Sequence, residues 1–226
     1  MEQYSQIKAK HAQDILLFRL GDFYEMFHED AKTASKVLGI VLTSRSKGDA
    51  RIPMCGIPYH SSQTYINRLL KAGHRVAVCE QLQDAEEAEG LVERGVVRVI
   101  TPGTLVEESI LEEKKNNYLA AAVEEGSKAG LAWVDLSTGE FRLADLPADR
   151  MADELARLAP SETLLPSSVI EAREPGVQAA AGGIVTPFHD WTFDRDTANL
   201  ALCEHFGVKS LRGFGSEELG PAVAAA

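Results

Sequence analysis

The chain of 226 residues is 45% hydrophobic and 25% charged, which places it among globular proteins and makes it long enough for one or two domains. No apolar run reaches the length of a membrane-spanning helix, and the first residues lack the basic region, apolar core and cleavage site of a secretion signal. We therefore predict a protein that neither crosses a membrane nor is secreted.

The net charge of −11 is unevenly distributed along the chain. Residues 1–105 contain 13 Lys and Arg against 13 Asp and Glu, whereas residues 106–226 contain 10 against 21. Phosphate contacts require Lys and Arg that acidic neighbours do not outnumber. If the protein binds nucleic acid, we expect the first part of the chain to do so.

The first part alternates helical and extended patterns, punctuated by Gly and Pro. Helices are expected at the amino terminus and in two later segments that end at glycines, residues 28–39 and 61–73. Strands are expected at residues 15–20, 41–45, 75–82 and 96–104. Residues 51–60, with two prolines and a glycine, are expected to be an irregular connection, and residues 84–93 an acidic loop.

A charged segment near residues 105–116 is the expected domain boundary. Three strands at hairpin spacing are expected beyond it, then a helix, two short strands and a further helix, at residues 117–125, 129–138, 140–146, 149–160, 163–166, 182–188 and 194–206. This order predicts an α/β domain. The terminal AVAAA is expected to be a helix cut short, so that the sequence would end inside a longer chain.

The three cysteines, Cys55, Cys79 and Cys203, are odd in number and widely spaced, which argues against a disulfide framework or a zinc motif. Cys55 and nearby His60 could form part of a metal site, but free thiols that pack as small apolar residues are more frequent. We expect the latter, and no bound metal. Tyr59 and His60 are expected to be structural, and Trp133 and Trp191 to be core residues.

Motifs of catalysis are scarce. The chain has no phosphate-binding Gly-rich loop followed by Lys and Ser or Thr, no GxSxG and no HExxH. Asp135, in WVDLSTGEF, is an acid on the first of three antiparallel strands, where ribonuclease-H-like nucleases carry a metal ligand. Two-metal hydrolysis needs several converging carboxylates, and the later strands TLLP and GGIVTPF supply none. We expect Asp135 to be a turn-side acid.

The segment FYEMF, after the Gly-Asp turn signal, combines aromatic rings with a carboxylate. If it is extended, Phe23 and Glu25 lie on one face and Tyr24 and Met26 on the other. An aromatic run beside a strand is usually core, but a core face does not carry an unpaired carboxylate because its burial is costly. A ring beside a hydrogen-bonding group can stack on a base and contact its edge.

Four blocks in order, GDFYEMF, IPMCGIPYH, VAVCEQ and VERGVVRVITPGT, closely resemble the amino-terminal part of the MutS family of DNA mismatch repair proteins, and the match of order and spacing extends to GFG near the end. The resemblance implies a mismatch-binding domain at residues 1–105, a mixed sheet flanked by helices. After a linker at residues 106–115, it implies a connector domain at residues 116–226, a ribonuclease-H-like α/β fold without nuclease activity.

In that family a Phe-x-Glu motif reads the mismatch, and it corresponds here to Phe23 and Glu25. The resemblance implies that Phe23 inserts from the minor groove and stacks on the mispaired or unpaired base, while Glu25 hydrogen-bonds that base. A mismatched site is weakly stacked, so kinking it costs less than kinking matched duplex. The resemblance also implies DNA contacts by Arg94 and Arg45, and charge and loop position add Lys47, Arg51 and Arg98.

The family's ATPase and clamp segments have no counterpart among these residues. The resemblance therefore implies that residues 1–226 are not an enzyme and bind no cofactor, whereas the full-length family protein uses ATP and magnesium. It implies a homodimer whose main contacts lie elsewhere, a connector that relays the signal and helps to bind MutL, and a bacterial cytoplasmic protein, nucleoid-associated when on DNA. Two alternatives stay open: a protein-binding module favoured by the acidic second part, and a metal-dependent nuclease built on Asp135.

Overall fold

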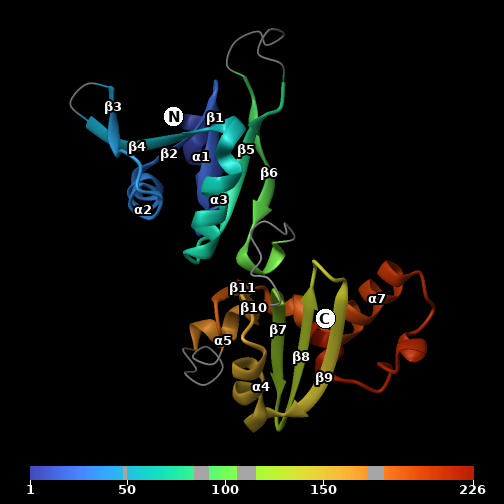
Figure 1. Cartoon of the computed structure of the whole chain (residues 1–226). Helices are drawn as coiled ribbons and strands as arrows, with labels where there is room; N and C mark the ends of the chain where they lie inside the picture. Colours follow the sequence, from blue (N-terminus) through green and yellow to red (C-terminus); the bar gives the residue numbers. More distant parts are fainter. Residues whose placement is uncertain (48–49, 84–91, 106–115, 173–180) are drawn as a thin grey trace. The chain divides into compact units, whose positions relative to one another are not determined.

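The computed structural model describes residues 1–47, 50–83, 92–105, 116–172 and 181–226 (Figure 1). Its internal contacts divide the chain into two compact units, Met1–Thr101 and Pro102–Ala226. Each unit is built on one mixed sheet with helices against it, which confirms the predicted α/β class. The acidic loop expected at residues 84–93 and the linker expected at 106–115 lie largely or wholly outside the described residues.

In the described part of unit 1 the sheet has six strands in the order β3-β4-β2-β1-β5-β6. The parallel pair is β1 with β5, and the other neighbours are antiparallel. The four predicted strands are confirmed, although β3 begins only at Thr43 and β6 ends at Ile100, and the FYEMF segment is extended, as β2. The bounds are β1 (Ile15–Leu20), β2 (Phe23–Phe27), β3 (Thr43–Lys47), β4 (Ala50–Pro58), β5 (Val76–Gln81) and β6 (Arg94–Ile100).

Helices lie against both faces of this sheet (Figure 1). On one face Tyr4 of α1 (Glu2–Lys10) packs among Leu16, Phe18 and Phe27. On the other face lie α2 (His28–Leu38) and α3 (Ser62–Lys71), which follows a short 3-10 turn η1 (Tyr59–Ser61). As predicted, α2 ends at Gly39, whose φ of 66° is the left-handed conformation that glycine adopts without strain.

The expected connection at residues 51–60 is instead mostly a strand, β4, so that prediction was wrong. Its two halves pair on different sides: residues 50–54 with β3 and residues 54–58 with β2. Pro53 and Pro58 therefore each have one side without a neighbouring strand. Proline has no backbone N–H, and on that side no hydrogen bond between strands is lost. Each half of β4 is an edge, and an edge tolerates proline.

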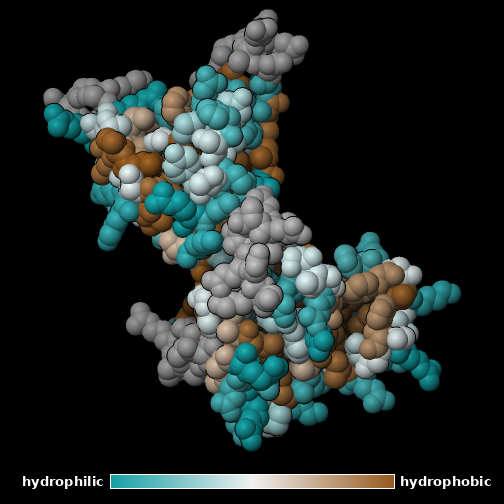
Figure 2. Space-filling view, viewed as in Figure 1, coloured by the Kyte–Doolittle hydropathy of each residue, from teal (hydrophilic) through white to brown (hydrophobic). Residues whose placement is uncertain are grey.

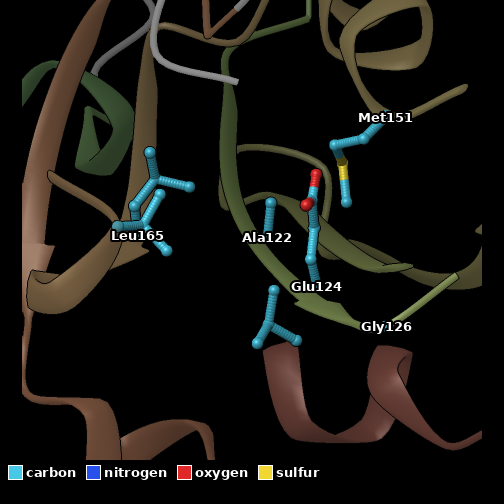
Figure 3. A pocket seen from close by; sticks show the side chains of 7 residues that line it. Ala122, Glu124, Gly126, Met151 and Leu165 are labelled. Atoms are coloured by element: carbon cyan, nitrogen blue, oxygen red, sulfur yellow. The ribbon is translucent and has the colours of Figure 1, made fainter. Parts of the chain in front are cut away.

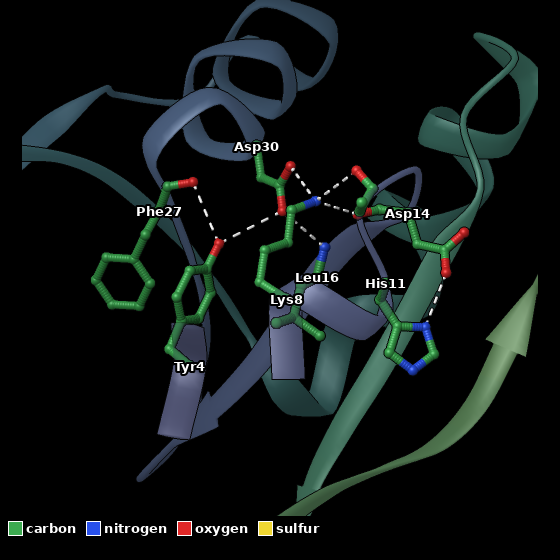
Figure 4. A network of polar contacts seen from close by, with 8 residues as sticks. Tyr4, Lys8, His11, Asp14, Leu16, Phe27 and Asp30 are labelled. Carbon is green, nitrogen blue, oxygen red and sulfur yellow. Dashed lines mark hydrogen bonds and ion pairs between the residues drawn. The ribbon is translucent and has the colours of Figure 1, made fainter. Parts of the chain in front are cut away.

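Asp30, at the start of α2, centres a buried polar network that ties α1 to the sheet (Figure 4). Its carboxylate accepts hydrogen bonds from Lys8 Nζ at 2.8 Å, from the backbone N–H of Leu16 at 3.1 Å and from the Tyr4 hydroxyl at 3.4 Å. Burial is the main reason why the pKa of Tyr4 is raised, so its hydroxyl stays a donor. The network fixes α1 over one face of the sheet.

Replacing Asp30 by asparagine is expected to lower the free energy of unfolding by roughly 2 kcal/mol, because a neutral amide cannot serve both the Lys8 ammonium and the buried N–H. Urea unfolding at pH 7 measures the change. Glu29→Gln is the matched control, since the Glu29 carboxylate pairs with Lys32 on an exposed surface and should cost about 0.5 kcal/mol or less. Equal losses in the two variants would contradict the role of the network.

In the described part of unit 2 the sheet has five strands in the order β11-β10-β7-β8-β9. The first three in sequence form an antiparallel meander, and β10 and β11 continue the sheet parallel to β7. The bounds are β7 (Tyr118–Glu125), β8 (Lys128–Asp135), β9 (Glu140–Pro147), β10 (Glu162–Pro166) and β11 (Ile184–Phe188). All five follow the predicted pattern of alternating and short apolar runs.

Two helical layers cover this sheet. On one face α4 (Met151–Leu158) packs on alanines of β7 and β8, and on the other α7 (Arg195–Phe206) and the fully buried α8 (Pro221–Ala225) pack together. The sequence missed α5 (Ser167–Glu171), which is short and follows a proline. Short 3-10 turns complete the unit: η2 (Pro102–Thr104), η3 (Ala148–Arg150), η4 (Asp190–Phe193) and η5 (Leu211–Phe214).

A cavity of about 280 Å³ opens beside β7 and α4 (Figure 3). Apolar side chains such as Ala122, Met151 and Leu165 line it, and among the described residues of its lining Glu124 alone is titratable. A single carboxylate supplies neither a metal site nor an acid and base pair. We assign this cavity no chemistry.

Candidate nucleic-acid interface

Phe23 and Glu25 share one face of β2, as predicted, and it is the face on which Tyr4 of α1 packs. Phe23 lies opposite Leu20 of β1 and Pro58 of β4, directly after a two-residue turn, and 48% of its surface is exposed. Tyr24 and Met26 point to the other face and are buried. An exposed ring on a paired strand is held rigidly and still has a free surface, so Phe23 is not a core residue.

Gly56 of β4 lies directly opposite Glu25 in the register. A Cβ atom there would meet Glu25 Cγ at 3.7 Å and Phe23 Cδ1 at 3.9 Å. The glycine therefore leaves open the space between the ring and the carboxylate. Sequence reasoning missed this role, because only the cross-strand register brings IPMCGIPYH beside GDFYEMF.

The Glu25 carboxylate lies between solvent and the sheet, with 22% of its side chain exposed. Oε2 is buried and accepts no hydrogen bond within the described residues, and the closest cation is Arg45 Nη1 at 3.6 Å. Desolvation raises the pKa of Glu25, and the positive charge of Arg45 opposes that rise only in part. The site thus holds a carboxylate with an unused acceptor atom beside an exposed ring.

Replacing Glu25 by glutamine is expected to stabilise the fold at neutral pH. Because the pKa of Glu25 is higher in the folded than in the unfolded chain, the folded state binds the proton more tightly, and stability falls as pH rises through that window. The advantage of Glu25→Gln should therefore shrink on acidification and vanish below the ordinary carboxyl pKa of about 4. Urea midpoints measured across pH test this, and a pH-independent difference would contradict it.

Two of the five predicted DNA-contact residues lie on the face of Phe23 and Glu25. Arg45, on β3, is exposed and pairs with Glu25. Arg94, on β6, lies over the Phe18 ring at 5.3 Å and donates to the backbone carbonyls of Arg19 at 2.7 Å and Val92 at 2.8 Å. Arg94 therefore also holds β1 and β6 together, a structural role that sequence reasoning did not foresee.

Two further candidates, Arg51 and Arg98, are not brought to that face. Arg98 lies opposite Val78 in the register, on the face of α2 and α3, and is exposed. Arg51 lies opposite Ser46 on the β3–β4 ladder, one position from the pair formed by Arg45 and Ile52, so Arg51 belongs to the other face of the sheet from Arg45. Lys47 ends β3, and its side chain lies outside the described residues. The charge of Arg51 and Arg98 does not by itself join them to the site.

Cys55 is a buried thiol, as expected, and its Sγ donates to the carbonyl of Ala31 at 3.4 Å. Burial raises the pKa of Cys55 and of Cys79 to about 11, which keeps both thiols protonated. His60 is exposed beside Tyr59 in η1. Nowhere in the described ranges do three or more His, Cys, Asp or Glu side chains gather as metal ligands.

Asp135 is a turn-side acid, as predicted, although it ends the second strand of the meander rather than lying on the first. Its carboxylate accepts hydrogen bonds from the Ser137 hydroxyl at 2.6 Å and the backbone N–H groups of Ser137 and Asn117. Burial alone would raise the pKa of Asp135, but these hydrogen bonds outweigh it and lower the pKa. Its oxygens are engaged in holding the turn.

Glu162, the first residue of β10, is a buried acid that sequence reasoning missed, since only TLLP was taken as the strand. It accepts hydrogen bonds from the Thr186 hydroxyl at 2.7 Å and from the backbone N–H of Gly103 at 3.3 Å. Asn117 donates to the carbonyls of Pro102 and Leu105. These groups fix the segment that enters unit 2, which is a structural task.

Trp191 is not a core residue, which corrects the prediction: it is 67% exposed, in η4, and stacks on His189. A short 3-10 turn presents most of its side chains to solvent, whereas Trp133, on a central strand, packs against the core. Trp191 lines an apolar cavity of about 670 Å³ beside α7. In Figure 2 hydrophobic side chains lie at the surface over α7, whose Leu200 and Phe206 are exposed.

Comparison with known proteins agrees with the two units. The family model described as MutS domain I matches residues 1–109, and the model for MutS domain II matches residues 117–226. The described helices include none long and apolar enough to span a bilayer.

Three curated relatives carry the name DNA mismatch repair protein MutS. That of Chlorobium phaeovibrioides is 46% identical over 96% of this chain and 26% of its own length. That of Symbiobacterium thermophilum is 47% identical over 99% of this chain and 26% of its own length. That of Methanothrix thermoacetophila is 53% identical over 75% of this chain and 20% of its own length. The chain thus spans about a quarter of the length of these relatives. It belongs to the MutS family, of which it carries domains I and II.

Proposed function

We propose that this chain is the mismatch-reading part of a DNA mismatch repair protein. The observation that carries the proposal is the pair on β2: a half-exposed Phe23 beside Glu25, whose buried Oε2 has no hydrogen-bond donor in the described residues. The names of the relatives and the two family models support the same function.

The pair suits recognition of structure rather than of sequence. Phe23 would enter a weak base step from the minor groove, and stacking on an aromatic ring tolerates any base. Glu25 would accept a hydrogen bond from the displaced base once its carboxylate turned toward the base, which would give the now buried Oε2 a partner and favour a base that offers a donor. A mismatch is selected because its duplex is already easy to kink.

The backbone of the kinked duplex needs positive charge near the reader. Arg45 is the exposed cation closest to Glu25 among the described residues and could turn from the carboxylate to a phosphate at little cost, since exposed ion pairs are weak. Arg94 is bonded to backbone carbonyls and would contribute mainly by positioning. Arg51 and Arg98, which lie off the face of Phe23, would contribute at most long-range attraction.

Unit 2 would be the connector, and its apolar surface around Trp191 favours a protein partner rather than DNA. We propose MutL as that partner in the full-length protein. ATP and magnesium would bind outside residues 1–226, as would the main contacts of a homodimer, so that this chain alone would be neither an enzyme nor a tight DNA binder. The working location would be the cytoplasm, at the nucleoid when on DNA.

The test is the affinity of the full-length protein for three duplexes that differ at one position: a G·T mismatch, an unpaired base, and a matched G·C pair, all at the same low salt. We expect both irregular duplexes to bind at least about tenfold more tightly, because saving ~1.4 kcal/mol of deformation energy is worth a factor of ten. Equal affinity for all three would contradict the proposal and favour a protein-binding module.

A further inference from the structure

The turn that precedes Phe23 determines where its ring can point. β1 and β2 are joined by only Gly21 and Asp22, and the Leu20–Phe23 pair closes the ladder next to them. Gly21 has a φ of 58°, a left-handed conformation that glycine supplies. Since Phe23 follows the turn directly, any change in the turn moves the ring.

Both carbonyls of this turn are bonded to groups outside it. Arg19 Nε donates to the carbonyl of Gly21 at 2.5 Å. The backbone N–H of Tyr59, which follows the last residue of β4, donates to the carbonyl of Asp22 at 3.0 Å. The turn is thus held from β1 and from the end of β4.

The two side chains involved also contact each other. The Arg19 guanidinium lies over the Tyr59 ring, 3.5 Å from its centroid, in a cation–π arrangement. Arg19 Nη1 also pairs with Glu80 Oε2 of β5 at 3.5 Å. Only 16% of the Arg19 side chain is exposed, so the guanidinium is fixed in place rather than free for a phosphate.

Tyr24 completes a row of side chains behind the reader. It lies opposite Arg19 in the register, on the face away from Phe23, and its hydroxyl donates to Glu80. Burial and the bond to Glu80 raise the pKa of Tyr24 to about 12, so the hydroxyl remains a donor at neutral pH. The row Tyr24–Arg19–Glu80 crosses β2, β1 and β5, and Tyr59 stacks on its middle member, Arg19.

We infer that Arg19 and Tyr59 are positioning residues for the mismatch reader: their stacked side chains lock the Gly21–Asp22 turn and so hold the Phe23 ring in its inserting orientation. The inference rests on the proposed function of Phe23. Neither residue is placed in contact with a base. Their contribution is to reduce the ordering that insertion requires, which is how a preorganised site gains affinity.

The test uses the full-length protein and the ratio of its dissociation constants for matched G·C and mismatched G·T duplexes. Arg19→Met and Tyr59→Ala are each expected to lower this ratio about fivefold, a loss that the free energy of one partly buried cation–π contact can account for. The affinity for matched duplex should change less than about twofold. Because the two side chains act as one unit, the double variant should lose no more than the worse single variant.

Two control variants should keep the ratio. Tyr59→Phe keeps the ring, and Arg68→Met removes a guanidinium that is bonded to a carbonyl elsewhere in unit 1.

The outcomes separate this inference from the proposed function. If the wild type itself fails to discriminate, the proposed function has failed. If the wild type discriminates and both single variants keep the ratio, the turn needs no lock and the inference is overturned. It is also overturned if mismatched and matched affinities fall together, since that pattern marks a general loss of folding. Amide exchange at Tyr59, faster in Arg19→Met than in Arg68→Met, is the expected sign of the released turn in the free protein.

Discussion

Replacing Gly130 by alanine is expected to destabilise unit 2 by about 3 kcal/mol or more, at the upper end of what overpacking costs. Gly130 lies on β8, on the face that α8 covers. A Cβ atom there would lie 1.9 Å from the carbonyl carbon of Pro221 and 2.2 Å from the backbone nitrogen of Ala222. These are backbone atoms, so the clash cannot be relieved by a side-chain rotation and α8 must shift.

Gly213 provides the matched control in the same unit. A Cβ atom at Gly213 would meet nothing within 4 Å, so Gly213→Ala should leave stability nearly unchanged. Urea unfolding of the 226-residue chain, followed by the fluorescence of its two tryptophans, compares the variants. If Gly130→Ala unfolded at the same urea concentration as Gly213→Ala, the tight packing of α8 on β8 would be wrong.

Replacing Phe23 by alanine is expected to remove most of the preference for mismatched DNA. Stacking of a base on an aromatic side chain is worth about 1–3 kcal/mol, which corresponds to a factor of roughly 5 to 150 in affinity for the kinked site. Since 48% of the Phe23 surface is exposed, its removal leaves little cavity and the fold should tolerate it. Affinity for matched duplex should change little.

Three variants separate stacking from apolar bulk and from the mere loss of an exposed ring. Phe23→Leu keeps an apolar side chain without a flat ring and should lose most of the discrimination, whereas Phe23→Tyr should retain it. Trp191→Ala removes an exposed aromatic residue of unit 2 and should leave mismatch affinity unchanged. A loss in Trp191→Ala equal to that in Phe23→Ala would mean that the assay reports stability.

Local patterns in the sequence predicted most elements because these elements depend on short-range chemistry. FYEMF alternates with a period of two, and its burial follows that alternation through Met26. Gly39 ends α2, and Asp194 begins α7 by accepting from the Thr197 backbone N–H at 2.9 Å. Such signals lie within a few residues of the structure that they determine.

The failures concern contacts between residues far apart in sequence. β4 accepts two prolines because β2 and β3 pair with different halves of it, which no local pattern reveals. The sheet register likewise separates Arg98 from the face of Phe23 and brings Gly56 and Tyr59 beside the reader. Phe23 and Glu25 were identified by resemblance to a family, and the alternation of β2 accounts for their common face.

The most direct test of the central claim is the ratio of dissociation constants for matched G·C and mismatched G·T duplexes, measured at one low salt for the full-length protein and its Phe23→Ala variant. The claim predicts a ratio well above one for the wild type and close to one for the variant, with matched affinity preserved. A folded Phe23→Ala protein that discriminates as well as the wild type would contradict it, because mismatch reading would then not depend on this ring.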